Sequence, residues 1–108
     1  MSTRLPGSKY KRVFDRGRVI RTRLFTAYVL QAEDAGRQAG VVVSKKSFHD
    51  AVDRNRAKRI LREAFRLWVP TSDLSADWVL VGRASLADRR TADVLAEIRF
   101  AAGKCARS

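Results

Sequence analysis

The stretch that decides the fold spans residues 40–68 and reads GVVVSKKSFHDAVDRNRAKRILREAFRLW. It opens with an apolar run at residues 40–44, whose branched side chains predict a buried strand. A long helix follows at residues 50–68, with Asp50 able to cap its first turn and Pro70 ending it. A strand that leads into a long helix is the first half of a β–α–β unit, so we expect a second strand beside the first.

The helix of residues 50–68 has two different sides when it is projected at about 100° per residue. An apolar arc predicts the side that packs on a core: Ala57, Ile60, Leu61, Ala64, Leu67 and Trp68. A separate polar arc carries Asn55, Lys58, Arg59, Arg62 and Arg66. Guanidinium groups suit bidentate contact with phosphates. We therefore expect a rigid ridge of cations that faces an anionic partner.

Shorter elements flank this stretch. Ser8 can cap a short helix that ends at Gly17, and three of its residues, Tyr10, Val13 and Phe14, are spaced for one apolar stripe.

Three further apolar runs predict the remaining elements. Residues 24–30 predict a strand that is covered on both faces, and residues 19–20 fit a short extra strand. Residues 76–82 predict the second strand of the β–α–β unit, and residues 91–100 predict a last amphipathic helix. The order α-β-β-β-α-β-α predicts an α+β fold of the α/β-sandwich kind, with a single mixed β-sheet packed by helices.

The positive charge is concentrated in two blocks. The chain has 108 residues, the length of one domain, and a formal net charge of +12. Residues 1–25 carry a net charge of +7 and residues 44–68 carry +5. Like charges this dense destabilise a small fold unless a polyanion binds, so the two blocks indicate one or two surfaces for nucleic acid.

Composition and motifs exclude several classes of function. A single cysteine, Cys105, and a single histidine, His49, rule out a disulfide framework and a Cys/His metal cluster. Apolar runs stay well short of the ~18 residues of a membrane span, and no signal peptide follows Met1, so we expect a cytoplasmic protein without a membrane partner. Motifs of nucleophilic, phosphate-loop and zinc enzymes are absent. We therefore predict no catalytic residue, no metal ligand and no small-molecule substrate for this chain.

Aromatic residues lie among the cations of the first block. Tyr10 and Phe14 are one helical turn apart between lysines and arginines, and Tyr28 lies in the next strand. Aromatic surface interleaved with cations is typical of proteins that stack unpaired bases while they neutralise phosphates. Spacing alone favours a plainer interpretation, in which Tyr10, Val13 and Phe14 form the core stripe of the first helix.

The central stretch closely resembles the signature of the bacterial ribonuclease P protein component. A strand, the lysine pair of residues 45–46, a spacer and the Arg-Asn-Arg helix of residues 54–56 occur in that family's order and close to its spacing. Residues 9–17 resemble the family's aromatic first helix, and residues 77–83 resemble its later strand, which begins with Asp and ends with Arg. The resemblance covers about residues 8–100.

The resemblance implies a fold, an activity and partners. The implied fold is an α/β sandwich whose β–α–β crossover is left-handed, an exception to the usual hand. The implied activity is removal of the 5′ leader of precursor tRNA by endonucleolytic cleavage, in which a catalytic RNA subunit performs the hydrolysis and the protein assists it at low Mg²⁺. The implied partners are ribonuclease P RNA and the 5′ leader of precursor tRNA. The implied cofactor is Mg²⁺, held mainly by the RNA subunit and the substrate.

The resemblance also implies roles for single residues. Contact with the RNA subunit is implied for Lys45, Lys46, Arg54, Asn55, Arg56, Lys58, Arg59 and Arg62. A cleft for the single-stranded leader is implied for Tyr10, Phe14 and Tyr28, which favours binding over the core stripe. We expect residues 8–102 to form a single RNA-binding domain between a flexible N-terminal arm, residues 1–7, and a flexible C-terminal tail, residues 103–108.

Two other functions stay open from the residues alone. A ribosomal or RNA-chaperone protein without a processing role would share the basic helix, although it would not need the ordered motif and the aromatic residues. A small stand-alone nuclease would need clusters of acids and histidines that the sequence lacks.

Overall fold

The β–α–β unit expected from residues 40–68 is present in the structure, a computed structural model that describes residues 3–106. Strand β3 (Ala39–Val42) leads into helix α2 (Ala51–Trp68), and β4 (Ala76–Gly82) follows. β3 and β4 are parallel neighbours in one sheet, so the crossover through α2 is confirmed. The left hand that the resemblance implies for this crossover stays a prediction.

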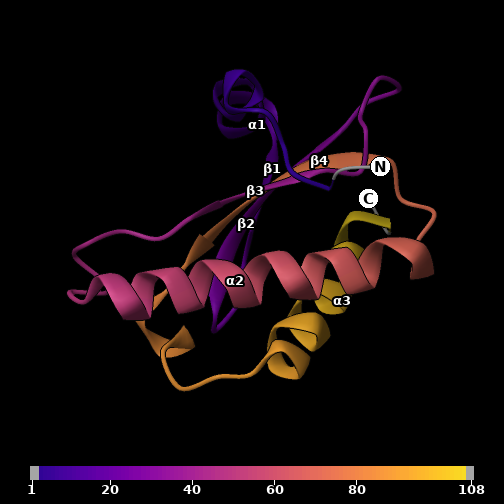
Figure 1. Ribbon diagram of the computed structural model, residues 1–108. Coiled ribbons are helices and arrows are strands. Elements are labelled where there is room, and N and C mark those ends of the chain that lie inside the picture. Colours follow the sequence, from indigo (N-terminus) through magenta and orange to yellow (C-terminus); the bar gives the residue numbers. More distant parts are fainter. Residues whose placement is uncertain (1–2, 107–108) are drawn as a thin grey trace.

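One four-stranded mixed sheet organises the rest of the chain (Figure 1). The strand order is β1-β2-β4-β3, and β1 (Arg18–Arg21) and β2 (Phe25–Gln31) pair antiparallel with their neighbours. Helix α1 (Tyr10–Arg16) precedes β1, and helix α3 (Thr91–Ala106) follows β4. Short 3-10 helices lie at Gly7–Lys9, Val69–Thr71 and Ala84–Leu86. The α+β class, the single mixed sheet and the short first strand are confirmed.

The helices cover the two faces of the sheet unequally. Figure 1 shows α1 alone on one face, here called the upper face, and α2 with α3 on the other, the lower face. Side chains of β2 alternate between the faces: Phe25, Ala27 and Val29 join the main core under the sheet, whereas Tyr28 and Leu30 pack near α1. Because α1 has only seven residues, it covers part of the upper face and leaves the rest open.

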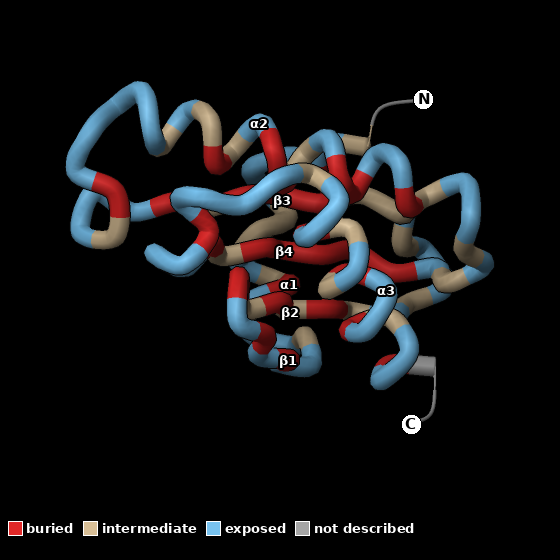
Figure 2. Tube along the Cα trace, turned by 90° about the horizontal axis from the view of Figure 1, so that it is seen from below, coloured by how far each residue is buried: buried red, intermediate tan, exposed pale blue. Residues whose placement is uncertain are grey.

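Helix α2 buries its predicted apolar arc with one exchange. Phe65 is buried between Trp68 and Trp78, with ring centroids 5.5 Å and 5.8 Å away, whereas Leu67 is 43% exposed. The sequence-based arc included Leu67 and omitted Phe65, which was wrong. Phe65 and Leu67 lie at opposite margins of the apolar arc. Trp78 of β4 packs against the margin that contains Phe65, which a helical projection cannot show. The buried residues along β3, β4 and β2 form the red centre of Figure 2.

The N-terminal segment lies against the sheet. The N–H of Leu5 donates to the carbonyl of Ala39 at 3.0 Å, and the N–H of Ala39 donates to the carbonyl of Thr3 at 2.8 Å. Leu5 is only 5% exposed. Where a flexible arm is expected for residues 1–7, residues 3–5 are thus paired with β3 and anchored by a buried leucine. The first two residues of the expected arm lie outside the described residues.

The last helix is longer than predicted. α3 continues past residue 100 to Ala106, and Cys105 is 2% exposed in the main core. Residues 103–106 are therefore helix, not the expected flexible tail of residues 103–108, whose end lies outside the described residues. The helix runs on because its apolar side continues to Ala101 and Cys105. Within residues 3–106 no helix is both long and apolar enough to cross a membrane.

Candidate RNA-binding surfaces

Helix α1 holds two aromatic rings against the upper face of the sheet. Tyr28 of β2 pairs with Val79 of β4, and Val79 pairs with Gly40 of β3, so the three residues form one row. The ring of Tyr10 lies over Gly40, and the ring of Phe14 meets that of Tyr28 edge-on with centroids 4.8 Å apart. The structure thus brings together all three aromatic residues predicted from the sequence.

Burial separates the core residue of α1 from its surface rings. Val13 is fully buried with Leu5 and Val79 in a small core under the helix. Phe14 is 38% exposed, and Tyr10 and Tyr28 are half-buried. The core stripe that spacing favours for α1 is therefore right for Val13 and in part for Tyr10, which packs against the same small core, but not for Phe14. Rings that are packed on one side and open on the other can stack with unpaired bases.

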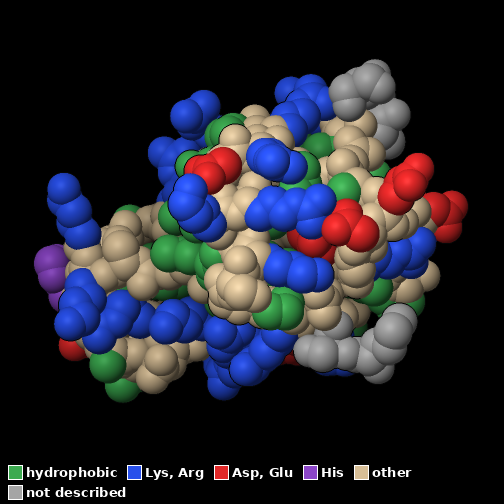
Figure 3. All heavy atoms as spheres, turned by 90° about the horizontal axis from the view of Figure 1, so that it is seen from above, with side chains coloured by type: hydrophobic (Ala, Val, Ile, Leu, Met, Phe, Trp, Pro, Cys, Tyr) green, Lys and Arg blue, Asp and Glu red, His purple; other side chains and the backbone are tan. Residues whose placement is uncertain are grey.

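The sheet beside α1 is open to solvent. A second row across the strands consists of Arg21, Thr26, Val81 and Val42. Arg21 is exposed, and the other three are only partly buried. We call this row the open strip. Figure 3 looks down on this face and shows Lys and Arg side chains over α1 and along the edge at which α2 runs.

A hollow of about 990 Å³ continues the open strip past the ends of β1 and β4. Its cationic lining consists of Arg21, Arg23 and Arg83. Ser47 also lines it, and the turn that contains Ser47 exposes Lys45 and Lys46 beside it. The lysine pair therefore lies next to the hollow.

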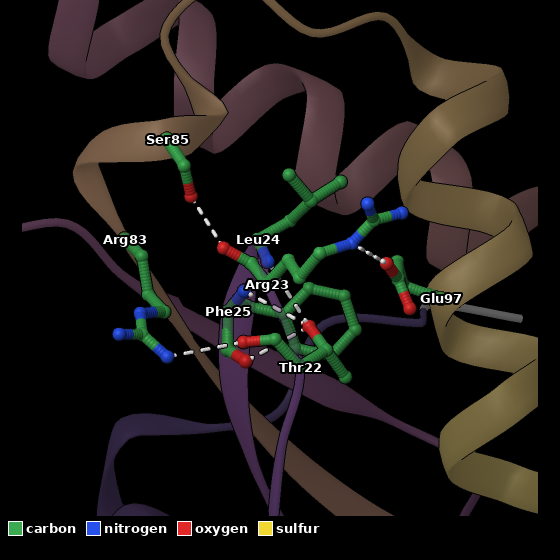
Figure 4. A network of polar contacts seen from close by, with 7 residues as sticks. All are labelled: Thr22, Arg23, Leu24, Phe25, Arg83, Ser85 and Glu97. Atoms are coloured by element: carbon green, nitrogen blue, oxygen red, sulfur yellow. Dashed lines mark hydrogen bonds and ion pairs between the residues drawn. The ribbon is translucent and has the colours of Figure 1, made fainter.

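Polar contacts hold the floor of this hollow (Figure 4). The hydroxyl of Thr22 closes the turn between β1 and β2 by accepting backbone N–H bonds, and the carbonyl of Thr22 accepts a bond from Arg83 at 3.1 Å. The hydroxyl of Ser85 donates to the carbonyl of Arg23, whose side chain lies 3.5 Å from the carboxylate of Glu97 on α3. The turn is thus tied to both β4 and α3.

An ion pair fastens α1 to the loop between β2 and β3. Arg12 donates to both carboxylate oxygens of Asp34, at 2.9 Å and 3.2 Å. These hydrogen bonds, and then the charge of Arg12, hold the pKa of Asp34 below its usual value. The buried carboxylate of Asp77 accepts the N–H of Gly36 at 3.1 Å and so fixes the same loop to β4. The loop therefore helps to set the position of α1 above the sheet.

The second basic surface is a groove between α2 and the N-terminal segment, with a volume of about 550 Å³, which we call the α2 groove. It is lined by Thr3, Arg4, Asn55, Lys58, Arg59, Arg62, Glu63 and Arg66. Lys58, Arg59 and Arg62 make no hydrogen bond or ion pair with any other residue of the described chain. Four residues predicted from the motif thus lie together here, and their cations are available to an external anion.

Two arginines of the motif are bonded into the fold. Arg54 donates to two carbonyls of the loop before α2, at 2.9 Å and 3.0 Å. Arg56 donates to the carbonyls of Ala87 and Arg89, in the loop before α3, at 2.6 Å and 2.8 Å. Both guanidinium groups therefore hold loops that contact the first half of α2. A helical projection could not show this, because the acceptors come from other segments.

Five cations near these surfaces are not among the predicted site residues, and two of them, Arg23 and Arg83, line the hollow. Arg4 and Arg66 line the α2 groove, and Arg21 lies on the open strip. Arg66 could have been found, because it lies on the polar arc of the helix. Arg4 could not, because the pairing of the N-terminal segment with β3 has no signal in the sequence.

Known proteins are similar to this chain in sequence and in fold. Residues 5–106 match the family model described as Ribonuclease P. The ribonuclease P protein component of Exiguobacterium sp. is 39% identical over 75 residues, which cover 69% of this chain and 64% of that relative. The ribonuclease P protein component of Desulforapulum autotrophicum is 38% identical over 85 residues, which cover 76% of this chain and 72% of that relative. A solved structure of Staphylococcus aureus RNase P protein superposes with a TM-score of 0.72 at 26% identity, over 93% of this chain and 92% of that one. The chain belongs to the ribonuclease P protein family.

Proposed function

We propose that this chain is the RNA-binding protein subunit of ribonuclease P and removes the 5′ leader of precursor tRNA together with a catalytic RNA subunit. The observation that carries the proposal is the half-exposed pair of Phe14 and Tyr28, which lies beside an open strip edged by cations. Rings beside cations suit an unpaired RNA strand, whose bases stack while its phosphates are neutralised. The alternative of a ribosomal or RNA-chaperone protein gives no reason for such a cleft.

The leader, in this proposal, lies on the upper face of the sheet. Tyr10, Phe14 and Tyr28 offer stacking surfaces, and the exposed Arg21 offers a phosphate contact where the strip opens into the hollow. Since stacking and charge are both insensitive to base identity, the cleft would accept leaders of many sequences.

The RNA subunit, in this proposal, is bound by the cations of α2. Asn55, Lys58, Arg59 and Arg62 contact its sugar–phosphate backbone, and Lys45 with Lys46 contact it next to the hollow. Arg54 and Arg56 contribute by holding the loops on either side of the helix, and any contact that they make with RNA uses the donors left over from those bonds.

Hydrolysis, in this proposal, belongs to the RNA subunit. Within residues 3–106 no three His, Cys, Asp or Glu side chains gather closely enough to hold a metal ion. We propose that Mg²⁺ is held mainly by phosphates of the RNA subunit and substrate. The cations of this chain would offset the repulsion between those two RNAs and so lower the Mg²⁺ concentration that cleavage needs. The site of action would be the cytoplasm, where precursor tRNA is made.

Cleavage of a precursor tRNA at low Mg²⁺ tests the proposal. The chain, a bacterial ribonuclease P RNA, and the two together are each incubated with the precursor, and the released leader is measured. We expect cleavage with the two together and little or none with either alone. Failure of the chain to stimulate the RNA would contradict the proposal, and cleavage by the chain alone would assign hydrolysis to the protein.

A further inference from the structure

We propose that the N-terminal segment, residues 3–5, is part of the surface that binds the RNA subunit, and that Arg4 contacts a phosphate of that RNA. This inference rests on the proposed function and deepens it: the groove beside α2 is completed by a segment that lies far from the Arg-Asn-Arg motif in the sequence. Its ligand is a sugar–phosphate strand of structured RNA.

Backbone pairing fixes the segment at the edge of the sheet. Arg4 forms a parallel bridge with Ala39, and the two hydrogen bonds of Ala39, to Thr3 and from Leu5, lie on either side of it. Leu5 points into the small core under α1, where it packs with Val13. Since neighbouring side chains of an extended chain point to opposite faces, the burial of Leu5 turns Arg4 toward α2.

Arg4 thereby joins the cations of α2 in one groove. Four cations of the helix, Lys58, Arg59, Arg62 and Arg66, line the groove with Arg4, and Glu63 is the single acid in its lining. None of the four helix cations has a hydrogen bond or ion pair with another described residue. Five cations this close repel one another in the free protein, and binding of phosphates relieves that repulsion.

The lining decides between two kinds of RNA. The α2 groove contains no aromatic side chain, whereas the cleft beside α1 contains three. Without rings the groove has nothing on which unpaired bases would stack, so it suits the phosphate backbone of a folded RNA and not the single-stranded leader. The paired backbone of residues 3–5 also places Arg4 in position before binding, which reduces the entropy that binding costs.

Replacement of Arg4 by Ala tests the inference in the full chain. The affinity for ribonuclease P RNA is measured between 50 mM and 200 mM salt, with Arg99→Ala as a matched control, because Arg99 is exposed on α3 outside the groove and the change in charge is the same. We expect Arg4→Ala to lower the slope of log affinity against log salt by about 0.7–0.9, so that its loss of affinity is about threefold larger at 50 mM than at 200 mM salt. Arg99→Ala should leave the slope unchanged.

A second variant tests the docking of the segment. Leu5→Ala removes the buried anchor and leaves every charge in place, so it should weaken binding of the RNA subunit as Arg4→Ala does. The double variant should then bind within about twofold of Arg4→Ala, because both changes remove the same contact. Full additivity of the two losses, or normal binding by Leu5→Ala, would overturn the role of docking.

The outcomes separate this inference from the proposed function. If Arg4→Ala keeps the salt slope of the wild-type chain, and the wild-type chain binds the RNA subunit and supports cleavage, this inference is overturned and the proposed function is not. A loss seen only with leader-bearing precursor, and not with the RNA subunit, would assign the groove to the leader and also overturn it. Failure of the wild-type chain to bind the RNA subunit would overturn the proposed function and this inference together.

Discussion

The ring of Tyr10 occupies the space that a Cβ would take at Gly40, so α1 touches β3 at a point where only glycine leaves room. This contact joins the aromatic cleft to the strand that leads into the lysine pair and α2. Gly40 therefore fixes the position of one ring of the cleft through the strand that also leads into α2.

Gly40→Ala should displace the Tyr10 ring. The added methyl group overlaps the far end of the Tyr10 side chain, which can swing away, so we expect little loss of stability. The leader should contribute less to the binding of precursor, by about 1–3 kcal/mol if one stacked base is lost. The measurement compares holoenzyme affinities for precursor with leader and for mature tRNA. Gly7→Ala is the control, because nothing lies within 4 Å of a Cβ there. Unchanged leader discrimination in Gly40→Ala would show that Tyr10 does not need its place over Gly40.

Gly17→Ala should destabilise the fold instead. A Cβ at Gly17 overlaps the carbonyl oxygen of Val13 and lies 3.1 Å from the backbone nitrogen of Val29, and backbone cannot swing aside. We expect a loss of about 1–3 kcal/mol in the free energy of unfolding, measured by urea denaturation. Gly103→Ala in α3 meets nothing within 4 Å and should raise that free energy by about 0.5–1 kcal/mol. Equal urea midpoints for the two variants would refute the close approach of α1 and β2.

Arg56 and Arg59 should differ in what they stabilise. Arg56 holds two carbonyls before α3, so Arg56→Ala should lower the free energy of unfolding by about 1 kcal/mol. Arg59 is exposed and has no partner among the described residues, so Arg59→Ala should stay within about 0.5 kcal/mol of wild type. The free energies of unfolding of both variants are measured by thermal or urea denaturation. Equal values would mean that the hydrogen bonds of Arg56 do not stabilise the fold.

Asp34→Asn should change how stability depends on pH. Because Arg12 lowers the pKa of Asp34 in the folded state, the pair stabilises the protein above the ordinary carboxyl pKa of about 3.9, and this contribution is lost as the pH falls through the lower folded pKa. Unfolding of wild type and variant should therefore differ at pH 7 and converge in strong acid. The difference should also shrink in high salt, since the pair is exposed.

Asp73→Asn is the control for this prediction. Asp73 has no hydrogen bond or ion pair with another described residue, so Asp73→Asn removes the same charge without breaking a contact and should leave the stability at pH 7 unchanged. A difference between Asp34→Asn and wild type that persists unchanged into strong acid would contradict the assignment to the Arg12 pair.

Local patterns in the sequence predicted most of the fold and much of the site. The strand and helix of residues 40–68 have strong periodicity, so their pairing with β4 and the grouping of Lys58, Arg59 and Arg62 could be predicted. The resemblance to a family assigned Phe14 to a surface, which spacing alone did not, and its 38% exposure agrees.

What the sequence could not predict depends on contacts between distant segments. Arg54 and Arg56 look like free cations in a helical projection, but loops from elsewhere supply carbonyls to both. Leu5 looks like part of a loose arm, but β3 supplies the backbone partner that holds it. In each case the deciding atom belongs to another element, and a pattern within one segment contains no information about it.

The most direct test of the two proposed surfaces uses two variants and two affinities. Phe14→Ala and Arg59→Ala are each measured for binding of ribonuclease P RNA and, in the holoenzyme, for the ratio of affinities for leader-bearing precursor and mature tRNA. Phe14→Ala should reduce the ratio by the equivalent of about 1–3 kcal/mol and leave binding of the RNA subunit intact. Arg59→Ala should lower the salt slope of RNA-subunit binding by about 0.7–0.9 and leave the ratio intact. Loss of both properties in either variant, or the reverse pattern, would contradict the assignment of two surfaces to two RNAs.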